Sequence, residues 1–326
     1  MKSASAAVRI IGVGNMGGGM VSNLLARGWR VQVHDIDPEK IDFYKQKGAQ
    51  SFMEYAQVAP ENIATLASQP AVTIVCVVDA AQTEHVLWGR AHDTTHDTAQ
   101  PGGLAECVGA GHTVMLCPTI APDDVERFAA GLARRGIHTI DAPMSGGPAR
   151  AADGSMSLML ACSDALLAQH ATLIHALSAK VFHISQRVGD AARTKLVNNL
   201  LAGINLVGAA EALALAERMG LDLTKTLDVI EQSSGQSWIG SDRMRRALAQ
   251  DYVPRAHTTL LAKDTALAIR AAQALQFTGP LGQHASAVFH QAVGQGMAEL
   301  DDAAVFELLR GLQLRHSKLV GKSLPK

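Results

Sequence analysis

A glycine motif near the beginning of the chain constrains its fold more than any other feature. Val8–Val13 is an apolar run interrupted by a single arginine, as expected for a strand that is buried on both faces of a parallel sheet. It leads into the pattern GxGxxG and then into a predicted helix over residues 15–27. The three glycines permit a tight turn, close approach of the backbone to a pyrophosphate, and close packing of helix on strand. The sequence therefore predicts a dinucleotide-binding βαβ unit. Its cofactor contacts would be Gly12, Gly14, Asn15, Met16 and Gly17.

The first half of the chain alternates between strand-like and helix-like segments. Further strands are expected at 30–34, 72–78, 114–116, 137–140 and 155–160, and helices at 38–48 and 122–135. This alternation is typical of a parallel, doubly wound sheet. We therefore expect an α/β fold with a Rossmann-type sheet.

The second half has a different pattern. Small and apolar residues recur at helical spacing, and Gly220 ends a long predicted helix over residues 190–219. More helices are expected at 224–231, 239–249, 260–275, 282–295 and 303–311. No strand is expected among them. We predict a Rossmann domain at residues 1–187 and an all-helical domain at 188–326, which would bind substrate and form oligomer contacts.

Composition excludes several classes of partner. The 326-residue chain has 29 Lys and Arg against 30 Asp and Glu, and no long basic run, so nucleic acid is not expected. No run of about 18 apolar residues predicts a membrane span. Four cysteines without CxxC spacing favour buried thiols in a reducing, cytoplasmic setting. His92 and His96 have helical metal-ligand spacing, but the polar stretch 89–103 has the composition of a surface loop, so no metal is expected.

An acidic residue at the end of the second strand indicates which dinucleotide binds. Asp35 lies 23 positions after Gly12, where a carboxylate would accept hydrogen bonds from the adenosine ribose and repel a 2′-phosphate. No arginine follows closely, so NAD is favoured over NADP. The alternative is that Asp35 and Asp37 only shape a turn.

The segment Asp141–Leu160 carries a second glycine loop. Ser145, Gly146 and Gly147 have little or no side chain, so their backbone amides could approach and hold a small carboxylate. The alternative is an ordinary glycine turn between two strands.

Two polar residues on the long helix have a spacing suited to proton transfer. Lys195 and Asn199 stand four positions apart and therefore on one helix face. Desolvation and a nearby nicotinamide cation would each disfavour the ammonium form of the lysine. The alternative is a solvated lysine at a helix start. Lys263 begins a later helix and could reach cofactor or substrate, or could be a surface lysine.

Taken in order, these motifs resemble the β-hydroxyacid dehydrogenase family, which includes 3-hydroxyisobutyrate dehydrogenase and tartronate semialdehyde reductase. The resemblance rests on four segments spanning about residues 8–312: Gly12–Met20, Asp141–Gly147, Lys195–Asn199 and Lys263–Asp264. It implies NAD-dependent oxidation of a small hydroxy acid by a homodimer or homotetramer. The second half is most similar to L-threonate dehydrogenases within the family, through motifs such as Gly235–Trp238.

The resemblance also implies roles for individual residues. Lys195 would be the general acid/base, Asn199 would orient the substrate, and Ser145, Gly146 and Gly147 would hold its carboxylate. Trp238 would contact substrate, while Val77, Val78, Thr119 and Lys263 would contact cofactor, together with the glycine loop and Asp35. Two alternatives remain within this interpretation. One is a 3-hydroxyisobutyrate dehydrogenase or tartronate semialdehyde reductase, and the other is an NAD-binding module without catalysis.

Overall fold

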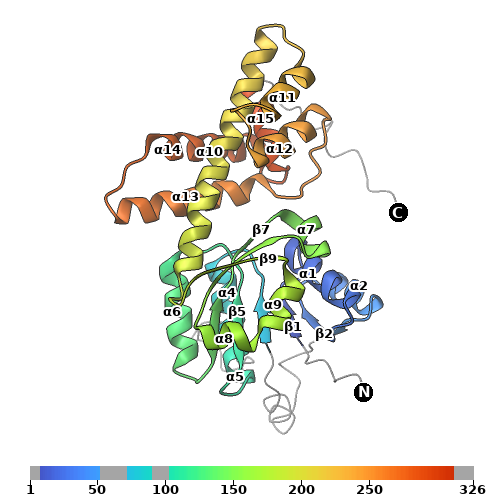
Figure 1. Ribbon diagram of the computed structural model, residues 1–326, viewed down its shortest axis with the longest axis vertical. Coiled ribbons are helices and arrows are strands. Elements are labelled where there is room, and N and C mark those ends of the chain that lie inside the picture. Colours follow the sequence, from blue (N-terminus) through green and yellow to red (C-terminus); the bar gives the residue numbers. More distant parts are fainter. Residues whose placement is uncertain (1–7, 52–71, 90–102, 312–326) are drawn as a thin grey trace, which may run out of the picture. The chain divides into compact units, whose positions relative to one another are not determined.

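The computed structural model describes residues 8–51, 72–89 and 103–311 (Figure 1). The polar stretch that contains His92 and His96 lies outside the described residues. The chain divides into two compact units, Met1–Lys195 and Leu196–Lys326. The domain boundary expected at residues 187 and 188 stays a prediction.

The first unit is built on one sheet. Its parallel part comprises β1 (Val8–Ile11), β2 (Val31–His34), β3 (Gln50–Ser51), β4 (Val72–Val75), β5 (Thr113–Leu116) and β6 (His138–Asp141). Their order is β3-β2-β1-β4-β5-β6, and every neighbouring pair is parallel. The strand order reverses between β1 and β4, which is the switch point at which doubly wound sheets bind ligands. The predicted Rossmann-type fold class is confirmed.

The far edge of the sheet differs from the all-parallel expectation. The sheet continues with β7 (Met144–Ser145), β8 (Ser157–Ala161) and β9 (Lys180–Ser185), and β8 runs antiparallel to both β6 and β7. The connection from β7 to β8 holds only α7 (Gly147–Asp153) and a turn. A parallel neighbour needs a crossover of a dozen or more residues, so the chain returns antiparallel instead.

Helices cover both faces of this sheet. Ile10 and Ile11 belong to different buried clusters, because successive strand side chains point to opposite faces. The Ile10 cluster includes side chains of α1 (Asn15–Ala26) and α9 (Ala171–Leu177), and the Ile11 cluster includes those of α4 (Ala80–Trp88) and α6 (Pro122–Ala133). The other helices in the described part of this unit are α2 (Pro38–Gln46), α5 (Leu104–Cys107) and α8 (Asp164–Gln169).

The second unit is helical in its described residues. The long helix α10 (Asp190–Arg218) starts at the end of the first unit and is followed by α11 (Leu223–Glu231), α12 (Trp238–Leu248), α13 (Thr258–Ala274), α14 (Pro280–Ala292) and α15 (Val305–Arg310). Leu206 and Leu213 of α10 are fully buried against Phe289 and Phe306. This agrees with the helical second half expected from the sequence.

One described helix has the length and composition of a membrane span. It is α10, drawn in yellow in Figure 1. The central helix of a protein core meets the same criterion, and 44% of the apolar window of α10 is buried inside the structure. Leu206, Ala210 and Leu213 of this helix are fully buried, as in a core helix.

Candidate functional site

The glycine loop after β1 has the geometry that a bound pyrophosphate requires. Gly12 has φ +87°, and a Cβ there would lie 2.5 Å from the carbonyl oxygen of Cys76. A Cβ on Gly17 would lie 1.9 Å from the carbonyl oxygen of Gly12. Gly14, by contrast, has nothing within 4 Å of such a Cβ and caps α1 without a side-chain hydrogen bond. The loop is thus open where a phosphate would meet the start of α1, and the residues present fit a dinucleotide.

The Asp35 carboxylate joins the end of β2 to this loop. The Val13 amide donates to its Oδ2 (2.8 Å) and the Asp37 amide to its Oδ1 (3.0 Å). Asp37 in turn caps α2 by accepting from the Glu39 amide. The turn-shaping role is therefore present, and the ribose contact of Asp35 stays a prediction.

Sequence reasoning missed a basic residue beside these carboxylates. The ammonium of Lys40 lies 3.9 Å from Asp35 and 3.6 Å from Asp37. In a sequence, the expected signal for a residue that binds a 2′-phosphate is an arginine immediately after the strand. Lys40 instead lies in the first turn of α2, and its side chain reaches back toward Asp35 and Asp37. A hollow of about 530 Å³ borders the same side of the loop, lined among others by Gly14, Asn15 and Lys40.

Four loops leave the carboxyl edge of the sheet at one level. Ile11 pairs in register with Val75, Val75 with Leu116, and Leu116 with Asp141. The segments that follow these four residues therefore emerge side by side from the edge where α/β sheets bind ligands. They carry the predicted site residues Gly12, Val77, Val78, Thr119 and Ser145. Val78 is half exposed, and its amide donates to Gln82 Oε1.

Two thiols lie directly beyond β4 and β5 at this edge. Cys76 is partly buried and Cys117 is buried, and both are free. Desolvation raises the pKa of Cys76 to about 12 and that of Cys117 well above its ordinary value. Both thiols therefore stay protonated at neutral pH and are not nucleophiles.

The second glycine loop requires glycine at two consecutive positions. Gly146 has φ +135° and Gly147 has φ +77°. A Cβ on Gly146 would lie 2.9 Å from Arg150 Cδ, whereas nothing lies within 4 Å of one on Gly147. Ser145 precedes them in β7, opposite Ser157. The loop thus has the backbone freedom expected of a carboxylate cradle, although its ligand stays a prediction.

A buried carboxylate stands between this loop and the start of α10. Asp141 ends β6 and is 1% exposed. Its Oδ2 accepts from the amides of Gly189 (2.9 Å) and Ala192 (3.0 Å). Burial raises its pKa to about 6, although these backbone hydrogen bonds and the charge of Arg193 act in the opposite direction. In the sequence, Asp141 belongs to a family motif but has no signal of its own role.

The candidate proton-transfer lysine is buried. Lys195 lies in the second turn of α10 and is 7% exposed. This burial does not fit the alternative of a solvated lysine at a helix start. Lysine is seldom buried unless it has a partner or a chemical task.

In the second unit, Asn199 belongs to a chain of polar contacts. Its Nδ2 donates to Asp264 Oδ2 (2.5 Å), and its Oδ1 accepts from Asn198 (3.0 Å). The ammonium of Lys263 lies 2.8 Å from Asp264 Oδ1. Asp264 is 6% exposed and therefore fixes both Asn199 and Lys263. The sequence analysis finds Asn199 and the Lys263–Asp264 motif but assigns no role to the carboxylate of Asp264, which links the other two residues.

Trp238 begins α12 and is 46% exposed. The guanidinium of Arg243 lies 5.9 Å from the centre of its ring. No group of three or more His, Cys, Asp or Glu residues in the described ranges is arranged to hold a metal ion.

Comparisons with known proteins agree with this geometry. Residues 7–185 match the model of the NAD binding domain of 6-phosphogluconate dehydrogenase. Residues 189–309 match the model described as NAD-binding of NADP-dependent 3-hydroxyisobutyrate dehydrogenase.

Similar whole proteins are hydroxy-acid dehydrogenases by name. An L-threonate dehydrogenase of Escherichia coli O6:H1 is 32% identical, over 95% of this chain and 97% of its own length. A 3-hydroxyisobutyrate dehydrogenase of Pseudomonas aeruginosa is 30% identical, over 93% and 98%. The crystal structure of 3-hydroxyisobutyrate dehydrogenase from Salmonella typhimurium is 30% identical and superposes with a TM-score of 0.80, over 93% of this chain and 100% of that one. The chain therefore belongs to the 3-hydroxyisobutyrate dehydrogenase family and is an NAD-dependent hydroxy-acid dehydrogenase.

Proposed function

We propose that this enzyme oxidises an L-threonate-type sugar acid with NAD, and that Lys195 is its general acid/base. The observation that carries the proposal is the burial of Lys195 in the second turn of α10. The start of α10 is hydrogen-bonded to Asp141, which belongs to the same segment as the Ser145–Gly147 loop. The substrate class is supported by similarity to L-threonate dehydrogenases at 32% identity.

The residues of this chain bind, orient and exchange a proton. The amides of Ser145, Gly146 and Gly147 hold the substrate carboxylate, which fixes the position of the hydroxyl. Lys195, as the neutral amine, accepts the hydroxyl proton during oxidation and returns it to the oxygen in the reverse direction. Asn199 stands one helical turn beyond Lys195 on the same face and orients the substrate. The bound nicotinamide supplies the hydride chemistry.

The cofactor is held by the carboxyl edge of the sheet in the first unit. The proposed contacts are the glycine loop (Gly12, Gly14, Asn15, Met16, Gly17), Asp35, Val77, Val78 and Thr119, with Lys263 from the second unit. The glycine loop offers the open start of α1 to the pyrophosphate. Asp35 favours NAD over NADP because its carboxylate would repel a 2′-phosphate. Trp238 is proposed as a substrate contact.

Other acids are the second candidate substrates. The Pseudomonas aeruginosa relatives at 30% identity are named 3-hydroxyisobutyrate dehydrogenase and NAD-dependent L-serine dehydrogenase. A tartronate semialdehyde reductase activity would use the same groups on the reverse reaction. A non-catalytic NAD-binding module is disfavoured, since the similar curated proteins are named dehydrogenases.

The test of the substrate is NADH formation, followed by absorbance, with L-threonate, 3-hydroxyisobutyrate, D-glycerate and L-serine. We expect the highest kcat/KM with L-threonate, and a lower value when NADP replaces NAD. Preference for another acid would contradict the threonate assignment while keeping the reaction class. Preference for NADP would contradict the role proposed for Asp35.

We further propose two domains at residues 1–187 and 188–326, a homodimer or homotetramer, and a cytoplasmic location. The domain proposal is supported by the two family models, which meet between residues 185 and 189.

A further inference from the structure

We propose that Asp141 is a positioning residue for Lys195. Its carboxylate ties the first turn of α10 to the end of β6 and thereby sets where Lys195 stands. This inference rests on the proposed role of Lys195. It assigns a role to the buried Asp141 carboxylate, which takes no part in the proposed cofactor binding or proton transfer.

The contacts of Asp141 converge on the start of α10. One oxygen, Oδ2, accepts from both the Gly189 and the Ala192 amides, at 2.9 and 3.0 Å. The side chain is 1% exposed, so water does not compete for these hydrogen bonds. Gly189 has φ +98°, which turns the chain sharply into the helix. A single carboxylate thus satisfies two of the amides that a helix start leaves without partners.

The position of Lys195 follows from that anchor. Ala192 and Lys195 are three residues apart, so they are neighbours on one side of α10. A shift or fraying of the first turn therefore moves the lysine with it. On the other side, Asp141 lies four residues before Ser145 in the same segment. The carboxylate consequently holds the proposed base and the proposed carboxylate cradle in a fixed mutual position.

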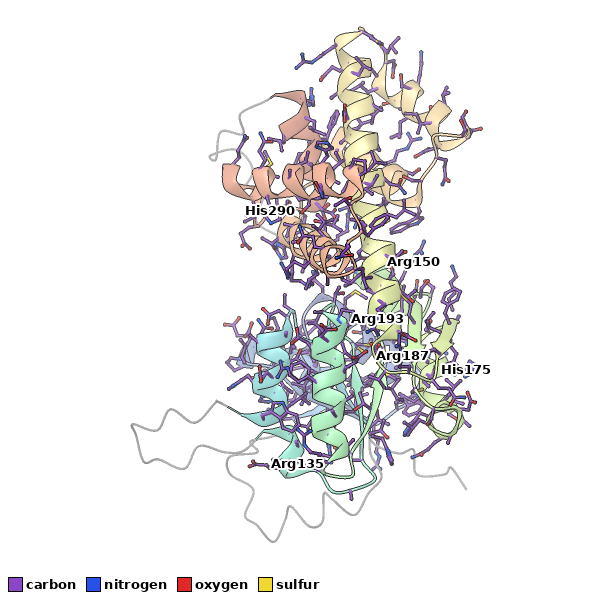
Figure 2. All side chains as sticks on the ribbon, turned by 90° about the vertical axis from the view of Figure 1, so that its left-hand side faces the viewer. Arg135, Arg150, His175, Arg187, Arg193 and His290 are labelled. Atoms are coloured by element: carbon purple, nitrogen blue, oxygen red, sulfur yellow. The ribbon has the colours of Figure 1, made fainter. Side chains whose placement is uncertain are left out.

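A second acidic residue at the same helix start, Asp190, bonds to side chains rather than to backbone amides. Asp190 accepts from the side chains of Ser185 (2.7 Å), Arg187 (2.7 Å) and Arg193 (3.2 Å). Figure 2 shows these two arginines at this end of α10. Asp190 thus bonds to side chains near the surface, whereas Asp141 bonds to the helix backbone. Asp190 therefore provides a control carboxylate at the same helix start.

Burial disfavours the charge of Asp141, and its surroundings offset part of that cost. A helix N-terminus stabilises a nearby anion, and Arg193 adds a positive charge on the same turn. Among the described residues, the thiols of Cys117 and Cys162 also interact electrostatically with Asp141, and burial raises the pKa of both. Both thiols are therefore neutral at pH 7.

The experiment compares Asp141→Ala, Asp141→Asn, Asp190→Asn and Lys195→Ala in the full-length enzyme at pH 8. We expect Asp141→Ala to lower kcat roughly 10- to 100-fold, with the KM of the acid and the NADH dissociation constant nearly unchanged. Asp141→Asn keeps an oxygen that accepts from both amides, so it restores most of the lost kcat. Asp190→Asn leaves kcat within about twofold of the parent enzyme, since a surface ion pair contributes little.

Hydrogen exchange over residues 189–196 gives a readout that needs no turnover. We expect faster exchange in Asp141→Ala and not in Asp190→Asn. If folded Asp141→Ala keeps the parent kcat, or if its loss appears only in KM, the inference is overturned. If Asp141→Ala does not fold, the Asp141→Asn variant decides. Unchanged kcat and unchanged hydrogen exchange in that variant support the positioning role, because the hydrogen bonds to the two amides are retained. A loss of kcat as large as that of Lys195→Ala overturns it.

The Lys195→Ala variant separates the positioning inference from the proposed function. A normal kcat in that variant refutes the proposed function. A large loss in Lys195→Ala beside a normal Asp141→Ala refutes only the positioning inference.

Discussion

Lys195 and Asn199 are buried, at 7% and 8% exposure, although lysine and asparagine ordinarily lie at protein surfaces. Burying such groups costs free energy unless partners compensate for the lost water. For Asn199 the compensation is visible, because its amide donates to Asp264, which also faces Lys263. Polar residues retained at this cost are candidates for chemistry rather than for packing.

Asp264 provides a test at the level of one residue. Asp264→Ala removes the acceptor of the Asn199 amide and the ionic partner of Lys263. We expect the free energy of unfolding to fall by about 1–3 kcal/mol, the usual cost of leaving a buried polar group without its partner. We also expect the KM of the acid to rise, because Asn199 loses its orientation. Urea unfolding and steady-state kinetics measure the two effects, and unchanged values of both would contradict the proposed roles of Asp264 and Asn199.

At the scale of elements, the glycine loop after β1 was predictable because its constraint is local. Gly12 has φ +87°, and a Cβ on Gly17 would meet the carbonyl oxygen of Gly12 only five positions before it, so the spacing of the motif itself encodes this turn. The helices α1, α10 and α12 begin within a residue or so of their predicted starts, because apolar periodicity and glycine ends mark them.

Other features of the elements depended on distant pairings and could not be read from the chain. The antiparallel return of β8 depends on the short connection through α7. The contacts of Asp141 with Gly189 and Ala192 span 48 and 51 positions, and that of Asn199 with Asp264 spans 65. No periodicity or motif spacing encodes such a contact. Lys40 was missed for a different reason: it lies only five positions after Asp35, but the expected signal was an arginine directly after the strand.

Two glycine substitutions test the element-level account as a matched pair. Gly17→Ala places a Cβ 1.9 Å from the carbonyl oxygen of Gly12, so the glycine loop must move. We expect NADH binding to weaken at least tenfold (about 1.4 kcal/mol) and the melting temperature to fall. Gly208→Ala, on α10, meets nothing within 4 Å and should stabilise the helix by up to about 1 kcal/mol. Fluorescence titration of NADH and thermal melting check both, and equal NADH affinity in the two variants would refute the assigned role of the loop.

At the scale of the whole molecule, each unit has its own core, and each carries some of the proposed site residues. The first unit carries the proposed cofactor contacts of the sheet edge, the Ser145–Gly147 loop and Lys195. The second carries Asn199, Trp238 and Lys263. The family and the reaction class were predictable from four motifs in order along the chain. The individual acid was not, because its selection depends on the shape of a site built from distant segments.

Oligomeric state is a prediction at this scale. Several large apolar side chains of α10 are more than half exposed, namely Val197, Leu201 and Leu215. Apolar side chains aligned along one helix commonly mark a protein–protein interface. We expect sedimentation velocity at micromolar concentration to show a homodimer or homotetramer, and Leu215→Glu to shift it toward monomer. A monomeric parent enzyme under these conditions would contradict the expectation.

The most direct test of the central claim is kcat for the preferred acid in Lys195→Ala and Lys195→Arg, each beside the NADH dissociation constant. Arginine keeps the positive charge but does not give up its proton at working pH. We predict that both variants lose roughly 10²–10⁴-fold in kcat, the usual contribution of a positioned acid/base, with NADH affinity retained. A near-normal kcat in either variant would remove Lys195 from the mechanism.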